Sequence, residues 1–211
     1  MRSGWWTGRS AWTPRSCALI STPRTPRASQ GALPNYKNLA DEPVDHGIGR
    51  SRGGLSTKVH SLVDGNGRPL TVLVGPGHSG DSPMLPGLLE GLSVPRPGRG
   101  RPRTRPDALL ADKAYCSKAH RTMLTGRGIK VVIPQRADQI RNRQRLGCKG
   151  GRPPGLDEQA YKGRNVVERS FCAAKQWRGL ATRYDKHAIN YRAAFVLFSA
   201  LTWLELIGDT P

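Results

Sequence analysis

The sequence predicts an α/β protein in which helices pack on a mixed β-sheet. Residues 56–63 and 68–75 are rich in β-formers and flank the turn sequence DGNG, which is a strong hairpin signal. Beyond them, apolar segments at 107–112 and 129–134 have the composition of buried strands and alternate with helical patterns. A hairpin followed by alternating strands and helices is typical of a mixed sheet covered by helices.

Four helical segments complete this prediction. Their signals are caps at the start, glycine at the end and apolar residues at a spacing of three to four. They are 81–92, capped by Asp81 or Ser82; 117–128, ended by glycine; about 157–178; and the apolar segment 193–207.

The first 50 residues have a different composition from the rest of the chain. They are rich in Pro, Arg, Ser and Thr and lack a sustained period of two or 3.6, which predicts an irregular or disordered segment. We therefore expect one domain at residues 51–211. Within it, 94–106 and 135–155 are cationic loops rich in Gly and Pro. They either solubilise the protein or follow the phosphates of a nucleic acid.

The charge balance points to an anionic partner. The chain has 34 Lys and Arg against 15 Asp and Glu, a formal net charge of +19 and a pI near 10.9. Nucleic acid is the first candidate and an anionic membrane the second. The apolar segment 193–207 is shorter than the roughly 20 residues of a spanning helix and contains Glu205. No secretory signal is evident, and the four cysteines lack zinc-site spacing, so we expect a cytoplasmic protein.

The segment 161–179, YKGRNVVERSFCAAKQWRG, divides into two stripes when it is read as a helix. The expected core stripe is Val166, Ser170, Ala173 and Trp177. The polar stripe is Tyr161, Arg164, Glu168 and Lys175. By itself the polar stripe is equally well read as a solvated face with ordinary ion pairs.

Two carboxylates have positions that suit metal binding. Asp112 ends an apolar strand and Glu168 lies on the polar stripe, and Mg²⁺ prefers carboxylate oxygens. A pair of such ions acts on phosphodiesters, but a third carboxylate is normally needed to bridge them. The other candidates have simpler roles: Asp64 in the hairpin turn, Asp81 as a cap, Asp41, Glu42 and Asp45 as solvated residues, and His60 and His78 as strand and loop residues.

These segments resemble one protein family. YKGRNVVERSFCAAK resembles the Tyr-Arg-Glu-Lys signature of bacterial insertion-sequence transposases, and Tyr161, Arg164, Glu168 and Lys175 fill its four positions. LLADKAY resembles the strand that carries the family's second catalytic Asp. Together with the hairpin and the C-terminal segment, the resemblance covers about residues 40–200.

The resemblance implies a DDE transposase with an RNase H-like mixed sheet flanked by helices. It implies that Asp112 and Glu168 are catalytic and bind Mg²⁺ or Mn²⁺, and that Tyr161, Arg164 and Lys175 contact DNA. The implied partners are insertion-sequence ends and target DNA, and paired ends suggest a homodimer. The implied location is the nucleoid of the bacterial cytoplasm. The alternative is a basic nucleic-acid-binding protein that keeps the fold without catalysis.

One family feature is missing from the sequence. The first catalytic Asp, in a segment resembling VDSTVVRAHQHA, has no counterpart, and residues 4–24 lack strand character. In a shifted reading frame, the codons of Trp12 and Thr13 necessarily give GAC, which encodes Asp. With suitable third bases, residues 4–23 become LVDWSVGVDSTVVRAHQHA. We therefore expect that about the first 28 residues are out of frame, that the sheet lacks its first strand, and that the chain alone is inactive.

Overall fold

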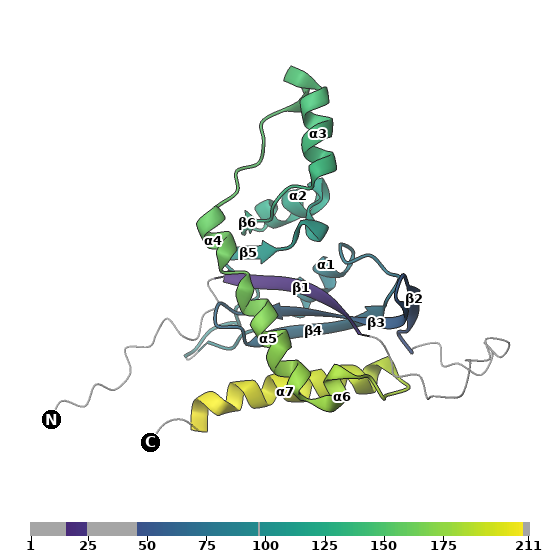
Figure 1. Ribbon diagram of the computed structural model, residues 1–211. Coiled ribbons are helices and arrows are strands. Elements are labelled where there is room, and N and C mark those ends of the chain that lie inside the picture. Colours follow the sequence, from purple (N-terminus) through teal and green to yellow (C-terminus); the bar gives the residue numbers. More distant parts are fainter. Residues whose placement is uncertain (1–15, 25–45, 97, 209–211) are drawn as a thin grey trace.

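The computed structural model describes residues 16–24, for their backbone only, and residues 46–96 and 98–208 (Figure 1). A six-stranded sheet in the order β2-β3-β1-β5-β6 forms its centre, with β4 also paired to β3. β1 is antiparallel to β3 and parallel to β5, which is parallel to β6. The strands are β1 (Ser16–Arg24), β2 (Gly49–Ser51), β3 (Gly54–Val63), β4 (Pro69–Pro76), β5 (Ala108–Ala111) and β6 (Lys130–Val132).

Helices cover both sides of this sheet, and in the described residues two short 3-10 turns interrupt the connections. The helices are α1 (Met84–Glu90), α2 (Lys118–Gly126), α3 (Ala137–Arg145), α4 (Glu158–Lys162), α5 (Asn165–Gln176), α6 (Arg178–Ala181) and α7 (Ala188–Gly208). The 3-10 turns are η2 (Lys113–Tyr115) and η3 (Gly147–Gly150). The RNase H-like mixed sheet with flanking helices is confirmed.

The alternation of side chains along β5 separates two hydrophobic cores. Leu109 and Ala111 belong to the core under α1 and α2. Leu110 belongs to the core on the other side, with residues of α5 and α7 such as Phe171 and Phe195. Because successive side chains of a strand point to opposite faces, β5 is buried on both sides, as its continuous apolar sequence predicts.

The hairpin of β3 and β4 forms where it was predicted. The Oδ1 atom of Asp64 accepts hydrogen bonds from the backbone N–H groups of Asn66 and Arg68, at 2.9 and 2.8 Å. Gly67 has a φ of +88°, a conformation that glycine adopts without steric cost. Asp64 is thus the turn residue that the sequence predicted.

Contrary to the sequence prediction, the sheet has a strand in its central position. Residues Ser16–Arg24 form β1 between β3 and β5, within the segment 1–50 that was expected to be irregular. Two strands flank this position, and their backbone N–H and C=O groups on these edges need partners. β1 supplies them although its sequence, SCALISTPR, shows no clear period of two.

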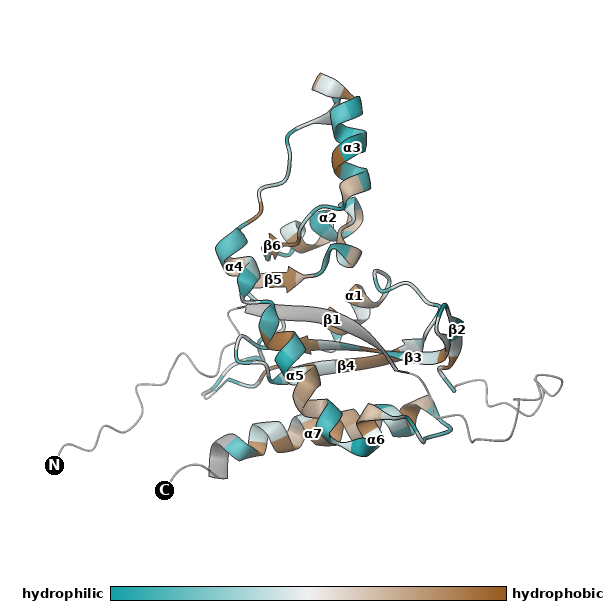
Figure 2. Ribbon diagram, in the orientation of Figure 1, coloured by the Kyte–Doolittle hydropathy of each residue, from teal (hydrophilic) through white to brown (hydrophobic). Residues whose placement is uncertain are grey.

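Two further predictions are corrected. The loop predicted at 135–155 contains α3, which has no buried residue and is hydrophilic along most of its length (Figure 2). The first helix begins at Met84 with Pro83 as its cap, so neither Asp81 nor Ser82 caps it. The side chain of Asp81 instead pairs with Lys58, with an Oδ1–Nζ distance of 2.9 Å.

The terminal helix α7 contains the predicted apolar segment but buries only one of its sides. Tyr191 and Phe195 are buried, whereas Leu197 and Leu204 are 55% and 54% exposed. Among the described residues, no helix has both the length and the apolar character that crossing a membrane requires.

Arg183 joins the C-terminal segment to the sheet. Its side chain is 2% exposed and donates hydrogen bonds to Oγ1 of Thr57 and to the backbone oxygens of His46, Gly47, Asp185 and Lys186. Its guanidinium also lies 5.4 Å from the centre of the Tyr191 ring. Burial lowers the pKa of this guanidinium, but arginine stays charged, so the carbonyl oxygens that surround it supply the compensation.

Candidate active site

Asp112 lies immediately after β5, at the carboxyl end of the parallel strands. Its Oδ1 atom accepts a hydrogen bond from the backbone N–H of Lys113 at 2.7 Å and thereby caps η2. Leu110 faces the core under α5 and α7, and side chains two residues apart along a strand share a face. Asp112 therefore continues the α5 side of β5, roughly 7 Å along the strand from Leu110.

The predicted polar stripe forms on α4 and α5. Nη2 of Arg164 lies 2.7 Å from Oε1 of Glu168, and the Arg164 guanidinium lies 5.7 Å from the centre of the Tyr161 ring. Lys175 is exposed two turns further along α5. The four signature residues therefore lie along two consecutive helices, with Tyr161 on α4 before the junction and the other three at or after it (Figure 1).

The core stripe of this helix differs from the prediction. Val166 is buried as expected, but Ala173 is exposed and Trp177 is 38% exposed. The residues that α5 buries are Val166, Val167, Phe171 and Ala174. The predicted helix 157–178 is also divided at Gly163 and Arg164, between α4 and α5.

The α4–α5 junction lies close to β5. A Cβ atom at Gly163 would lie 3.5 Å from Cδ2 of Leu110, so the backbone of the junction approaches the same face of β5 that continues to Asp112. α5 then crosses β1 and β3 (Figure 1). Asp112 and Glu168 consequently belong to the same side of the sheet, although they are 56 residues apart in the sequence.

Arg164 has an unused hydrogen-bond donor. Its Nη2 atom pairs with Glu168, but its Nη1 atom is buried and has no partner among the described residues. A buried donor without a partner costs roughly 1–3 kcal/mol. An anion that accepted this N–H would recover the cost, and a phosphate oxygen suits it because a hydrogen bond between a guanidinium and an anion is charge-assisted.

Comparison with known proteins identifies the family. Residues 20–203 match the family described as Transposase DDE domain. The chain belongs to this transposase family. A candidate transposase for insertion sequence element IS6501 of Brucella ovis is 29% identical over 150 residues, which cover 71% of this chain and 99% of that protein. A candidate transposase for element IS402 of Burkholderia cepacia is 32% identical over 139 residues, 66% of this chain and 57% of that protein.

A solved structure is also similar, at a greater distance. The Mos1 transposase in a paired-end complex with the left transposon end is 14% identical, with a TM-score of 0.34. The match covers 78% of this chain and 55% of the Mos1 chain.

In the part of the chain that the structure describes, the carboxylates do not form a complete set of metal ligands. The sequence of β1 contains neither Asp nor Glu, and the described residues contain no group of three His, Cys, Asp or Glu that could hold a metal ion. Of the other carboxylates near the sheet, Asp64 is engaged in the hairpin turn, Asp81 pairs with Lys58 and Asp107 pairs with Arg103. Asp112 and Glu168 stay predicted metal ligands.

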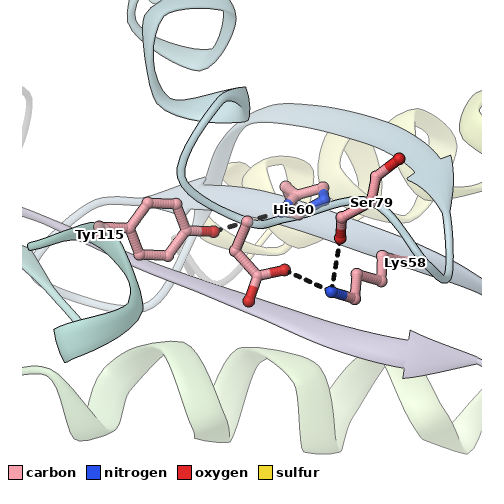
Figure 3. A network of polar contacts seen from close by, with 5 residues as sticks. Lys58, His60, Ser79 and Tyr115 are labelled. Atoms are coloured by element: carbon pink, nitrogen blue, oxygen red, sulfur yellow. Dashed lines mark hydrogen bonds and ion pairs between the residues drawn. The ribbon is translucent and has the colours of Figure 1, made fainter. Parts of the chain in front are cut away.

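A buried polar network behind Asp112 was not identified from the sequence. His60 on β3 is fully buried, and its Nδ1 atom lies 3.2 Å from the hydroxyl of Tyr115, the last residue of the turn that Asp112 caps (Figure 3). Burial, in part offset by Asp81, lowers the pKa of His60 to about 4, so the imidazole is neutral at pH 7. The sequence signal for this network was the histidine itself, which interrupts a β-strand segment rich in valine and leucine.

A basic arm, residues 134–157, rises from the same edge of the sheet as Asp112. Gln139 on α3 hydrogen-bonds Cys116, donating to its backbone oxygen at 2.8 Å and accepting from its Sγ at 3.1 Å. The arm carries Arg136, Arg141, Arg143, Arg145, Lys149 and Arg152. It returns to α4, where Asp157 caps the helix and pairs with Lys130.

Proposed function

We propose that this chain is the catalytic portion of a transposase that cleaves DNA at insertion-sequence ends and joins the freed ends to target DNA. One observation carries the proposal. Arg164 holds Glu168 on the Asp112 side of the sheet and keeps a buried, unpaired N–H in the same place. Two carboxylates beside an anion-binding donor are the combination that phosphodiester chemistry requires.

Each residue has a separate role in this proposal. Asp112 and Glu168 would hold a divalent cation, Mg²⁺ or Mn²⁺, which when bound supplies the activation of the attacking hydroxyl group. Arg164 binds a nonbridging phosphate oxygen through Nη1 while Nη2 keeps Glu168 in position. Lys175 holds a neighbouring phosphate as a point charge. Tyr161 contacts the DNA beside the cleaved strand.

The proposal includes inactivity of the chain in isolation. β1 pairs with β5 so that Leu19 is opposite Ala111, and the next position of β1, Ile20, follows in line with Asp112. A transposase with three acidic residues would need a carboxylate at this part of β1. The shifted reading frame over residues 4–23 would supply an Asp from the codons of Trp12 and Thr13, so the strand beside β5 would be formed by the sequence of that other frame, either in a frameshifted gene or by ribosomal slippage between two frames.

The experiment compares two versions of the chain. The first is the 211-residue protein, and the second carries VDSTVVRAHQHA in place of the corresponding residues. Both are incubated with duplexes that carry the DNA flanking the gene, with Mg²⁺ or Mn²⁺. We expect nicking at the element ends by the second version alone, and its loss on Asp112→Asn or Glu168→Gln. Nicking by the 211-residue chain would contradict the expected inactivity, and unchanged nicking by both point variants would overturn the site.

The absence of a carboxylate from β1 favours one second candidate, a DNA-binding protein without catalysis. It predicts that the version with the restored segment binds duplexes but never nicks them. Sequencing of the gene tests whether the missing catalytic Asp was lost through a frameshift. A shifted frame that does not encode the Asp-Ser-Thr segment would reject the frameshift.

A further inference from the structure

The turn that follows Asp112 is anchored on the opposite side of the sheet. The turn η2 begins directly after Asp112 and ends at Tyr115, whose side chain is buried in the core under α1 and α2. The hydroxyl of Tyr115 lies 3.2 Å from Nδ1 of His60, which is fully buried on β3 (Figure 3). Because Asp112 continues the α5 side of β5, this anchor holds the turn without occupying the candidate site.

Hydrogen bonds connect Asp112 to the anchor within a single turn of chain. The backbone N–H of Tyr115 donates to the oxygen of Asp112 at 2.9 Å, and that of Cys116 donates to the oxygen of Lys113 at 3.1 Å. The N–H of Lys113 donates to Oδ1 of Asp112 at 2.7 Å. The position of the Tyr115 side chain is thus coupled, through η2, to the direction of the Asp112 carboxylate.

The other end of the anchor belongs to a strand that is paired with three others. β3 forms hydrogen bonds with β1, β2 and β4. His60 lies well inside β3, opposite Leu73 of β4, and its neighbours Val59 and Ser61 are also buried. Side chains in such a close-packed interior hold their positions. The His60–Tyr115 contact therefore links the Asp112 turn to a rigid part of the fold.

Two other contacts hold the same turn less directly. Nδ1 of His120 on α2 lies 3.1 Å from the backbone oxygen of Tyr115. Gln139 on α3 donates to the backbone oxygen of Cys116 at 2.8 Å. Both contacts act on the backbone after Asp112 and do not involve His60. Loss of the His60–Tyr115 contact should therefore loosen the turn rather than remove it.

The His60–Tyr115 pair is an unfavourable choice if stability alone is considered. Nε2 of His60 is buried and has no hydrogen-bond partner among the described residues. Replacement of both members of a buried polar pair by apolar groups of similar shape is often neutral or stabilising. A hydrogen bond, unlike an apolar contact, depends on the angle at which its two groups meet. The pair is therefore better suited to fixing an orientation than to adding stability.

We propose that His60 and Tyr115 are positioning residues for Asp112. Their contact sets the rotation of η2 and, through it, the direction in which the Asp112 carboxylate points. The inference deepens the proposed function and rests on it for the role of Asp112. Neither positioning residue touches DNA or a cation, because both lie in the core on the far side of the sheet from α5.

The first test measures the Asp112 turn in the 211-residue chain without metal. Hydrogen exchange by NMR reports the N–H groups of Lys113, Tyr115 and Cys116, which form the hydrogen bonds of the turn. Tyr115→Phe removes only a hydroxyl and should raise these exchange rates roughly fivefold, the effect of one net hydrogen bond. Tyr191→Phe is the matched control, because it removes a buried hydroxyl that donates to Leu180 at 2.9 Å in the other core. It should leave the three rates unchanged.

Two replacements of His60 separate orientation from stability. His60→Leu combined with Tyr115→Phe removes both polar groups at similar volume, so the urea midpoint should equal or exceed that of the wild type while the turn exchanges faster. His60→Asn keeps a polar atom bonded to Cγ, as Nδ1 is, but leaves a small cavity. Its urea midpoint should fall while the turn stays protected. A contact with only a structural role would move both measurements together in every variant.

The version of the chain with the restored segment extends the test to the reaction. Tyr115→Phe in that version should lower the single-turnover nicking rate by about tenfold or more at saturating duplex, because small misplacements of reacting groups slow a reaction strongly. Its affinity for the duplex, measured by fluorescence anisotropy, should not change. His60→Asn should retain most of the nicking rate despite its lower stability.

The outcomes separate this inference from the proposed function. Unchanged exchange at the turn in Tyr115→Phe would overturn the inference, as would a large loss of stability in the apolar double variant. Faster exchange with an unchanged nicking rate would also overturn it. Absence of nicking by every version of the restored chain would reject the proposed function instead, and the exchange rates alone would then decide whether the pair orients Asp112.

Discussion

Two arginines in similar settings perform different tasks. Arg183 and Arg164 each lie over a tyrosine ring, at 5.4 Å from Tyr191 and 5.7 Å from Tyr161. Every nitrogen of the Arg183 guanidinium donates to the protein, whereas Nη1 of Arg164 is buried without a partner in the described residues. The fully satisfied arginine holds the fold together. The partly satisfied one retains a donor for a ligand, at some cost to stability.

The largest expected effect is at Arg183. Arg183→Ala should lower the free energy of unfolding by about 3–5 kcal/mol, because it leaves several buried carbonyl oxygens without a donor. Urea denaturation measures the change. Arg183→Lys is the matched control that keeps the charge, and it should recover little, because one ammonium group cannot reach acceptors on three segments. A loss below about 1 kcal/mol for Arg183→Ala would contradict the structural role assigned to Arg183.

His60 is a further buried polar group that can be compared with Arg183 and Arg164, and its Nδ1 atom contacts the hydroxyl of Tyr115. Its folded-state pKa of about 4 lies below the ordinary histidine value of 6.5, so protons bind the unfolded chain first as the pH falls. The contribution of neutral His60 to stability is complete above pH 6.5 and is lost progressively down to pH 4, by about 3 kcal/mol.

The measurement for His60 is the urea midpoint at several pH values. Between pH 6.5 and 5, above the range of most carboxylates, wild type should lose about 2 kcal/mol that His60→Gln does not lose. Parallel pH curves for the two proteins would mean that the pKa of His60 does not differ between the folded and the unfolded chain, which would contradict its burial as a neutral group.

Arg164 should affect DNA more than folding. Arg164→Ala should weaken duplex binding by about tenfold and reduce the slope of log affinity against log salt by about 0.9, since it removes one phosphate contact. Fluorescence anisotropy across a salt series measures both quantities. Arg169→Ala, which removes an exposed arginine from the same helix, is the control. An equal loss of duplex affinity in both variants would mean that Arg164 contributes only through its positive charge and not through a specific phosphate contact.

The smallest effect is expected for Glu168. Its side chain is 47% exposed in the pair with Arg164, so Glu168→Gln should change the free energy of unfolding by less than about 1 kcal/mol. The same change should abolish nicking by the restored chain. A large loss of stability would mean that the Arg164–Glu168 pair belongs with Arg183 as a structural contact.

The sequence predicted those parts of the fold whose local pattern matches their environment. The hairpin turn at Asp64, the buried strand that ends in Asp112 and the polar face of Glu168 were all evident, because each has a single dominant signal. The sequence also predicts, from a strand-end and a helix-stripe position, that Asp112 and Glu168 lie close together, and both this closeness and their roles as metal ligands stay predictions. The division of the helix at Gly163 was missed, and with it the burial of Phe171 in place of Ala173.

Two elements could not be predicted because their cause lies elsewhere in the molecule. β1 is a strand because β3 and β5 flank it on both sides, and its own sequence has Pro23 and no regular alternation. α3 has no buried residue, so hydrophobic periodicity gave no signal for it. The His60–Tyr115 contact joins residues 55 positions apart, and a buried histidine alone does not identify its partner.

The basic arm has a consequence for the continuity of the chain. Asp112 precedes it and Glu168 follows it, while α3 within it contributes no side chain to either core. Trypsin, which cuts after arginine and lysine, could cleave the peptide bond after Arg145 or Lys149 without exposing the cores. The two carboxylates would then lie on separate polypeptides held together by packing alone, so this protein is a candidate for reconstitution from two co-expressed pieces.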